Sequence, residues 1–146
     1  MSEERRMKTI AVIGAGYWGA NLVRNYFELG ALHSVCDART EVLTVMQKKF
    51  PDVKCSLSFE EVLADNAVKA VVIALPAECH YEFAAKALRA GKDVFVEKPL
   101  ALDLDHAKKL NAMALEEKRI LMVGHLLRYH PAFLKLKEII DKGTLG

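Results

Sequence analysis

The stretch TIAVIGAGYWG, residues 9–19, decides the fold of this chain. The apolar run over residues 9–13 predicts a β-strand that enters a glycine-rich turn, and the following residues predict a helix that extends to Leu29. A second apolar run, residues 34–36, ends in Asp37. This order of strand, glycine loop, helix, strand and acid is typical of the first half of a dinucleotide-binding unit.

Each glycine of the loop has a separate task in such a unit. Gly14 permits the tight turn, Gly16 lets a pyrophosphate approach the backbone, and Gly19 lets the helix lie close to the strand. The N–H groups and the positive dipole end of the helix face the phosphates. The glycines alone are also compatible with an ordinary strand-to-helix turn, but the second strand and its acid favour a dinucleotide site.

The acid also bears on the choice of cofactor. A carboxylate at Asp37 accepts both hydroxyls of the adenosine ribose and repels a 2′-phosphate, so the sequence predicts NAD rather than NADP. Arg39 weakens this preference, because an arginine just past the acid can hold a 2′-phosphate. The alternative, which we favour, is that Arg39 is a solvated surface side chain.

Composition places the chain among ordinary globular domains. With 146 residues, 52% hydrophobic and 27% charged, it suits a single domain over residues 1–146 with a substantial core. The net charge of +2 and the absence of a long apolar run argue against nucleic-acid and membrane partners. The polar start, Met1 to Lys8, does not resemble a signal peptide. The dispersed cysteines Cys36, Cys55 and Cys79 suit a reducing cytoplasm, with Cys36 in the core.

Strand and helix signals alternate along the rest of the chain, which predicts a doubly wound α/β Rossmann fold with a mostly parallel sheet of about six strands. The further strands are expected at residues 53–55, 69–75, 93–96 and 120–123. The further helices are expected at 40–50, 58–64, 78–90 and 103–117, with a last helix from Pro131 to about Lys142.

Ligands of such sheets bind at the carboxyl ends of the strands, which directs attention to Glu97-Lys98-Pro99-Leu100. A lysine at this place points toward the cofactor cleft, where its ammonium group can hold a hydroxyl or alkoxide as hydride leaves. An ordinary surface pair of Glu97 and Lys98 before a turn is the alternative, and the residues alone do not decide between them.

Two other strand ends carry candidate polar groups. His80, beyond Leu75 and Pro76, either lines the nicotinamide end of the cleft, caps a helix or is merely solvated. His125 is well placed for substrate, and Arg128 either anchors a carboxylate or phosphate or only orders its loop. The histidines and cysteines form no spaced ligand set, so we expect no metal.

With these pieces in order, the chain resembles the N-terminal half of the Gfo/Idh/MocA oxidoreductase family. Four segments carry the resemblance: AVIGAGYWG (11–19), VVIALPAECH (71–80), VEKPLAL (96–102) and VGHLLRYHPAF (123–133). The last of them is most similar to the branch that oxidises the 3-hydroxyl of UDP-N-acetylglucosamine-type sugars and their uronic acids.

The resemblance implies a site residue by residue. The pyrophosphate would be held by Gly14, Gly16, Tyr17, Trp18 and Gly19. Asp37 would hold the adenosine ribose, and Leu75, Pro76 and His80 would border the cofactor. Glu97 would lie by the nicotinamide ribose, and Lys98 would meet the hydroxyl that is oxidised.

The resemblance also implies a second domain that this chain does not contain, since members of the family are more than twice as long. That domain covers the nicotinamide, supplies much of the sugar pocket and the usual catalytic histidine, and often builds a homo-oligomer. We therefore expect an expressed fragment, one half of a split protein or a cofactor-binding remnant. Leu126, Leu127, Tyr129 and Phe133 either form a face for self-association or belong to the domain's own core.

Three functions follow as hypotheses. The first is the NAD-binding half of a sugar dehydrogenase, in which catalysis by this chain alone is in doubt. The second is a free-standing NAD(H) sensor or regulatory subunit, which needs the glycine loop and Asp37 but not Lys98. The third is a related small-molecule reductase that uses NADPH, for which Arg39 would be responsible.

Overall fold

The computed structural model describes residues 7–143, so expectations for the first six residues and for Thr144-Leu145-Gly146 lie outside the described residues. A six-stranded, wholly parallel sheet forms the centre of the molecule, in the order β3-β2-β1-β4-β5-β6. The strands are β1 (Ile10–Ile13), β2 (Leu32–Cys36), β3 (Lys54–Ser56), β4 (Ala70–Ile73), β5 (Asp93–Val96) and β6 (Leu121–Val123). The predicted doubly wound Rossmann fold is confirmed.

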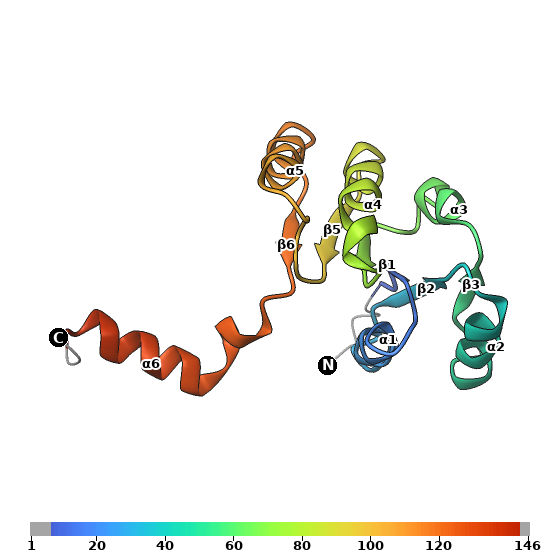
Figure 1. Ribbon diagram of the computed structural model, residues 1–146. Helices are drawn as coiled ribbons and strands as arrows, with labels where there is room; N and C mark the ends of the chain where they lie inside the picture. Colours follow the sequence, from blue (N-terminus) through green and yellow to red (C-terminus); the bar gives the residue numbers. More distant parts are fainter. Residues whose placement is uncertain (1–6, 144–146) are drawn as a thin grey trace.

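Helices cover both faces of the sheet (Figure 1). Helices α1 and α2 pack on one face, and α3, α4 and α5 pack on the other. Their bounds are α1 (Gly19–Glu28), α2 (Thr40–Lys49), α3 (Phe59–Ala64), α4 (Ala77–Arg89) and α5 (Leu104–Glu116), followed by the 3₁₀ helix η1 (Leu126–Tyr129) and α6 (Pro131–Asp141). The strand order reverses between β1 and β4, and ligands of such sheets bind at this reversal.

Alternation along the central strands supplies the two cores. In β1, Val12 packs toward α1 and α2, whereas Ala11 and Ile13 pack toward the opposite layer. Strand β4 is buried from Val71 to Ile73, as its β-branched sequence predicted for a strand covered on both faces. Cys36 belongs to the core, and burial raises the pKa of its thiol to about 11.

The predicted helix caps at Ser58 and Asp103 are confirmed. The Ser58 hydroxyl accepts from the Glu61 N–H at 3.2 Å, and the Asp103 carboxylate accepts from the His106 N–H at 2.8 Å. Strand β2 begins at Leu32 rather than at the expected residue 34, because Leu32 itself is buried in the α1–α2 core. The other expected elements agree with the structure to within about two residues at their ends.

The carboxyl-terminal part was predicted less well. The sequence analysis did not predict η1, and α6 extends away from the sheet (Figure 1). Leu126, Leu127, Tyr129 and Phe133 are all exposed, so the expectation that they belong to the domain's own core is wrong. Among residues 7–143, no helix is long and apolar enough to cross a membrane.

One ionic cluster joins the connections at the amino-terminal edge of the sheet. The Asp65 carboxylate accepts from the Ala67 N–H at 2.8 Å, and lies 3.0 Å from His33 Nε2 and 3.4 Å from Lys54 Nζ. These bonds hold the pKa of Asp65 at about 2. The buried Lys92 ammonium donates to the carbonyls of Asp65 and Val68.

This depressed pKa predicts a specific pH dependence of stability. The folded pKa of about 2 lies below the ordinary value near 3.9, so ionised Asp65 stabilises the fold above about pH 4 and loses that effect as the pH falls through about 2. Asp65→Asn should therefore lower the urea midpoint near neutral pH, and its difference from the parent should shrink in acid. Asp52→Asn, at an exposed carboxylate, serves as the control. If the urea midpoint of Asp65→Asn differs from that of the parent by the same amount at every pH, the stabilising role of ionised Asp65 is contradicted.

Candidate functional site

The site begins where β1 turns into α1 with no room for side chains. Gly14 has φ +87°, and a Cβ there would lie 2.6 Å from the Ala74 carbonyl oxygen. A Cβ on Gly19 would lie 2.0 Å from the Gly14 carbonyl oxygen. Both distances are far shorter than a van der Waals contact, so only glycine allows the loop to pass between β4 and the first turn of α1.

The start of α1 is suited to an anion. Trp18 is its N-cap and provides no side-chain cap, and the first turn carries no acidic residue. The N–H groups of Ala20 and Asn21 donate to the carbonyls of Gly16 and Trp18 at 2.9 Å. No side-chain cap or acidic residue therefore competes with phosphate oxygens for the positive dipole end of the helix. Tyr17, 95% exposed, points into solvent beside this turn, whereas the Trp18 side chain is only half exposed.

Asp37 links the end of β2 to the glycine loop. It is 6% exposed, and its Oδ2 accepts from the Ala15 N–H at 2.9 Å. Burial alone would raise the pKa of this carboxyl, but hydrogen bonds from Arg39 and Ala15, with the charge of Arg39, outweigh burial and lower it. Asp37 is therefore an ionised carboxylate next to the glycine loop.

Arg39 is the solvent-exposed side chain that we favoured from the sequence, with 54% of its side chain accessible, but it is also paired with Asp37. Its Nε donates to Asp37 Oδ1 at 3.0 Å and its Nη2 donates to Oδ2 at 3.1 Å, while its backbone N–H donates to Oδ1 at 3.0 Å. A Cβ on Gly16 would lie 3.3 Å from Nη2, so the guanidinium lies against the glycine loop. Its place over the acid could not be read from the two-residue spacing alone.

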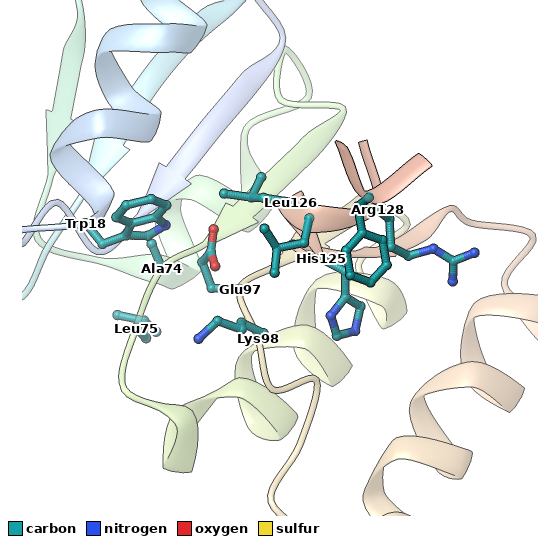
Figure 2. A pocket seen from close by; sticks show the side chains of 11 residues that line it. Trp18, Ala74, Leu75, Glu97, Lys98, His125, Leu126 and Arg128 are labelled. Carbon is teal, nitrogen blue, oxygen red and sulfur yellow. The ribbon is translucent and has the colours of Figure 1, made fainter. Parts of the chain in front are cut away.

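A pocket of about 790 Å³ opens at the carboxyl ends of β4, β5 and β6 (Figure 2). Of the predicted site residues, it brings together Trp18, Leu75, Glu97, Lys98, His125 and Arg128. Sequence reasoning had assigned no role in ligand binding to its remaining lining residues, Ala74, Gly124, Leu126, Leu127 and Phe133. The glycine loop and the Glu97-Lys98 strand end therefore meet at one edge of the sheet.

Glu97 is the most unusual group in this pocket. Its Oε1 is buried and has no hydrogen-bond partner among residues 7–143. Gly124 makes room for it, since a Cβ there would lie 3.0 Å from Oε2. Burial and then the charge of Glu97 raise the pKa of Tyr26. A buried carboxylate oxygen without a donor is costly, which indicates a place built for a ligand's hydroxyl or amide.

His80 and Pro76 do not line the pocket. His80 is 1% exposed, and its ring nitrogens lie 2.6 Å from the Pro99 carbonyl and 2.8 Å from the Leu75 carbonyl. Neither ring nitrogen is free for a cofactor. A ligand here would contact the segments at Leu75 and Pro99, which His80 joins, rather than His80 itself. No group of three His, Cys, Asp or Glu side chains within residues 7–143 is arranged to hold a metal ion.

Comparison with known proteins agrees with this geometry. A family model described as an oxidoreductase family with an NAD-binding Rossmann fold matches residues 8–125. An uncharacterized oxidoreductase of Schizosaccharomyces pombe is 36% identical over 93% of this chain and 38% of its own length. The NADP(+) scyllo-inositol 2-dehydrogenase of Bacillus subtilis is 28% identical over 97% of this chain and 40% of its own.

Solved structures give the same result. UDP-N-acetylglucosamine 3-dehydrogenase from Acidithiobacillus ferrooxidans is 32% identical with a TM-score of 0.82, over 89% of this chain and 42% of that one. GenD2 from gentamicin A biosynthesis, solved with NAD, is 33% identical with a TM-score of 0.87, over 94% of this chain and 40% of that one. The chain thus spans about two fifths of the length of these relatives.

The close packing at Gly19 can be tested with a matched pair of glycines. Gly19→Ala should lower the free energy of unfolding by about 1–3 kcal/mol through overpacking, and should weaken dinucleotide binding by roughly tenfold or more, about 1.4 kcal/mol. Gly91→Ala is the control, because Gly91 has φ +70° and a Cβ there meets nothing within 4 Å. It should cost about 1 kcal/mol of stability from backbone strain alone and leave dinucleotide affinity unchanged. Equal affinity in the two variants would contradict the assignment.

Proposed function

The chain belongs to the Gfo/Idh/MocA oxidoreductase family, and we propose that it is the dinucleotide-binding part of a sugar dehydrogenase. In this proposal hydride passes between a sugar hydroxyl carbon and nicotinamide. The observation that carries it is the meeting of three features at one sheet edge: the start of α1, the unpartnered Glu97 carboxylate and the Lys98 side chain. The first suits phosphates and the other two suit hydroxyls.

In the proposed complex, the backbone of Gly14, Gly16, Tyr17, Trp18 and Gly19 holds the pyrophosphate. The adenosine ribose lies at Asp37 and Arg39, and the loop of Leu75 and Pro76, with His80 behind it, borders the nicotinamide half. Bound nicotinamide supplies the hydride acceptor or donor. Glu97 Oε1 then gains the donor it lacks, from the nicotinamide ribose.

Lys98 is the proposed catalytic residue. Its ammonium group donates to the reacting sugar hydroxyl and stabilises the negative charge that develops on oxygen as hydride leaves carbon. Its exposed position at the pocket allows this contact (Figure 2). In this proposal the hydroxyl proton passes to a base that a second domain or a partner chain supplies.

The substrate side of the pocket belongs to His125 and Arg128, which line it opposite Trp18 (Figure 2). The Arg128 guanidinium suits a diphosphate or a carboxylate. We propose a nucleotide-sugar such as a UDP-N-acetylhexosamine or its uronic acid, oxidised at C3. The likeness to a UDP-N-acetylglucosamine 3-dehydrogenase supports this substrate class. The remainder of the sugar pocket and the contacts of a homo-oligomer would come from a second domain or a partner chain.

The choice of cofactor depends on the Asp37–Arg39 pair. An ionised carboxylate offers about four acceptor sites, and Asp37 already accepts from Ala15, from the Arg39 backbone and twice from the Arg39 guanidinium. The ribose hydroxyls of NAD must therefore displace the guanidinium. The charge of ionised Asp37 repels the 2′-phosphate of NADP, whereas the Arg39 guanidinium can hold it. We therefore propose NAD as the cofactor, with appreciable NADP binding.

Arg39→Met tests this choice directly. Removal of the guanidinium frees two acceptor sites, so NAD should bind roughly three- to tenfold more tightly and NADP roughly tenfold more weakly. Calorimetric titration with each nucleotide measures both. Arg24→Met, at an exposed arginine paired with Glu28 on α1, should change neither. Weaker NAD binding in Arg39→Met would show instead that the guanidinium contributes to the NAD site.

A free-standing NAD(H) sensor or regulatory subunit is the second candidate, since the glycine loop and Asp37 are already joined through the Ala15 N–H. It would use the glycine loop and Asp37 but have no use for Lys98. The two candidates therefore differ in what Lys98 does.

Lys98→Met distinguishes them in a preparation that oxidises a sugar. The variant should lose about 100-fold or more in kcat, since the developing alkoxide has lost its cation. Its Kd for NAD should stay within about twofold of the parent. Lys48→Met, on the exposed side of α2, is the control for a general loss of charge. Turnover that survives within a few-fold in Lys98→Met would reject the catalytic role.

A further inference from the structure

The Lys98-Pro99 segment is exposed although it stands at the centre of the proposed site. Before it, the Glu97 N–H donates to the Ile73 carbonyl at 3.0 Å, and after it, Leu100 packs against the core. Between these anchors, the contact from His80 is the single side-chain hydrogen bond that reaches Lys98 or Pro99 in the described part of the chain. The place of the Lys98 backbone therefore depends on few contacts.

His80 is held far more firmly. It lies in the first turns of α4, is 1% exposed, and its Nε2 is 2.8 Å from the Leu75 carbonyl at the end of β4. Its Nδ1 is 2.6 Å from the Pro99 carbonyl, which follows Lys98 directly. A carbonyl oxygen only accepts, so the bond to Pro99 requires the tautomer in which Nδ1 carries a proton.

We propose that His80 is a positioning residue: through its Nδ1–H bond to the Pro99 carbonyl, it fixes Lys98 at the pocket. The inference rests on the proposed role of Lys98, but the bond itself requires neither cofactor nor substrate. The imidazole joins the strand end that borders the glycine loop to the strand end that carries the lysine. A buried hydrogen bond of this kind constrains a loop whose own side chains face solvent.

Two substitutions separate positioning from packing. His80→Phe keeps a ring but has no donor, whereas His80→Asn loses the ring but keeps an N–H donor near the place of Nδ1. His106→Phe is the control, because it removes a histidine whose ring stacks on Tyr81 with ring centroids 3.8 Å apart and whose Nδ1 lies 2.7 Å from Asp103 Oδ2, and it leaves both bonds of His80 in place. All three variants alter stability to some degree, so stability alone is not the readout.

The measured quantity is the backbone order parameter of Lys98, from ¹⁵N relaxation of the 146-residue chain without cofactor. In the parent, His80→Asn and His106→Phe, it should be that of rigid backbone, about 0.85, and in His80→Phe it should fall below about 0.6. Histidine ring spectra of the parent should show a protonated Nδ1 at His80. This second measurement needs no variant, so it holds even if His80→Phe does not fold.

Three results would overturn the proposal: an unprotonated Nδ1 at His80, equal Lys98 order in the parent and His80→Phe, or a Lys98 as mobile in His80→Asn as in His80→Phe. A titration of the parent with NAD accompanies these measurements. The parent could bind no dinucleotide while the Lys98 order parameter is high in the parent and His80→Asn and low in His80→Phe. In that case the proposed function fails and the positioning role of His80 stands.

Discussion

The structure depends on one close approach at the reversal of strand order. Gly14 and Gly19 bring the backbone of β1, the end of β4 and the first turn of α1 within distances that admit no Cβ. This contact sets the direction in which the start of α1 points, and the Ala15 N–H then meets Asp37 at the end of β2. The backbone that we propose binds phosphate and the acid that we propose binds ribose are thereby held together before any ligand arrives.

The ends of the neighbouring strands supply the polar groups of the site. The ends of β5 and β6 add Glu97, Lys98 and His125 to a pocket that already contains Trp18 from the glycine loop. The two carboxylates of the site differ in their hydrogen bonds. Glu97 has a buried oxygen that accepts none from the described part of the chain, whereas the oxygens of Asp37 already accept from Ala15 and Arg39. In the proposed complex, Glu97 gains a donor and Asp37 exchanges the guanidinium for ribose hydroxyls, so both carboxylates change hydrogen-bond partners.

The elements that sequence predicted well are those specified by local chemistry. The strand at 93–96 agrees residue for residue, and Ser58 and Asp103 cap their helices as their side chains suggest. The glycine spacing and Asp37 were sufficient for the fold because each meets a requirement of the backbone nearby. The resemblance to a known family then supplied roles for Glu97 and Lys98 that spacing alone left undecided.

What the sequence could not predict depends on contacts between distant segments. The bond from His80 to Pro99 spans 19 residues, and no local pattern distinguishes it from a capping histidine. The closure of Arg39 over Asp37 depends on how the glycine loop lies beside it. The helix η1 and the outward direction of α6 were not predicted, because most of their apolar residues are exposed and do not pack on the sheet.

The central claim is that this chain binds a dinucleotide with its pyrophosphate on the glycine loop and its nicotinamide in the pocket. It can be tested with the chain's single tryptophan, Trp18, which lines that pocket. We would titrate the chain with NADH, excite the indole and record emission from the dihydronicotinamide, with ADP-ribose as the ligand that lacks this acceptor. Saturable energy transfer from Trp18 to NADH that ADP-ribose abolishes by competition is the predicted result. No saturable transfer, or transfer that ADP-ribose leaves unchanged, would contradict the proposed site.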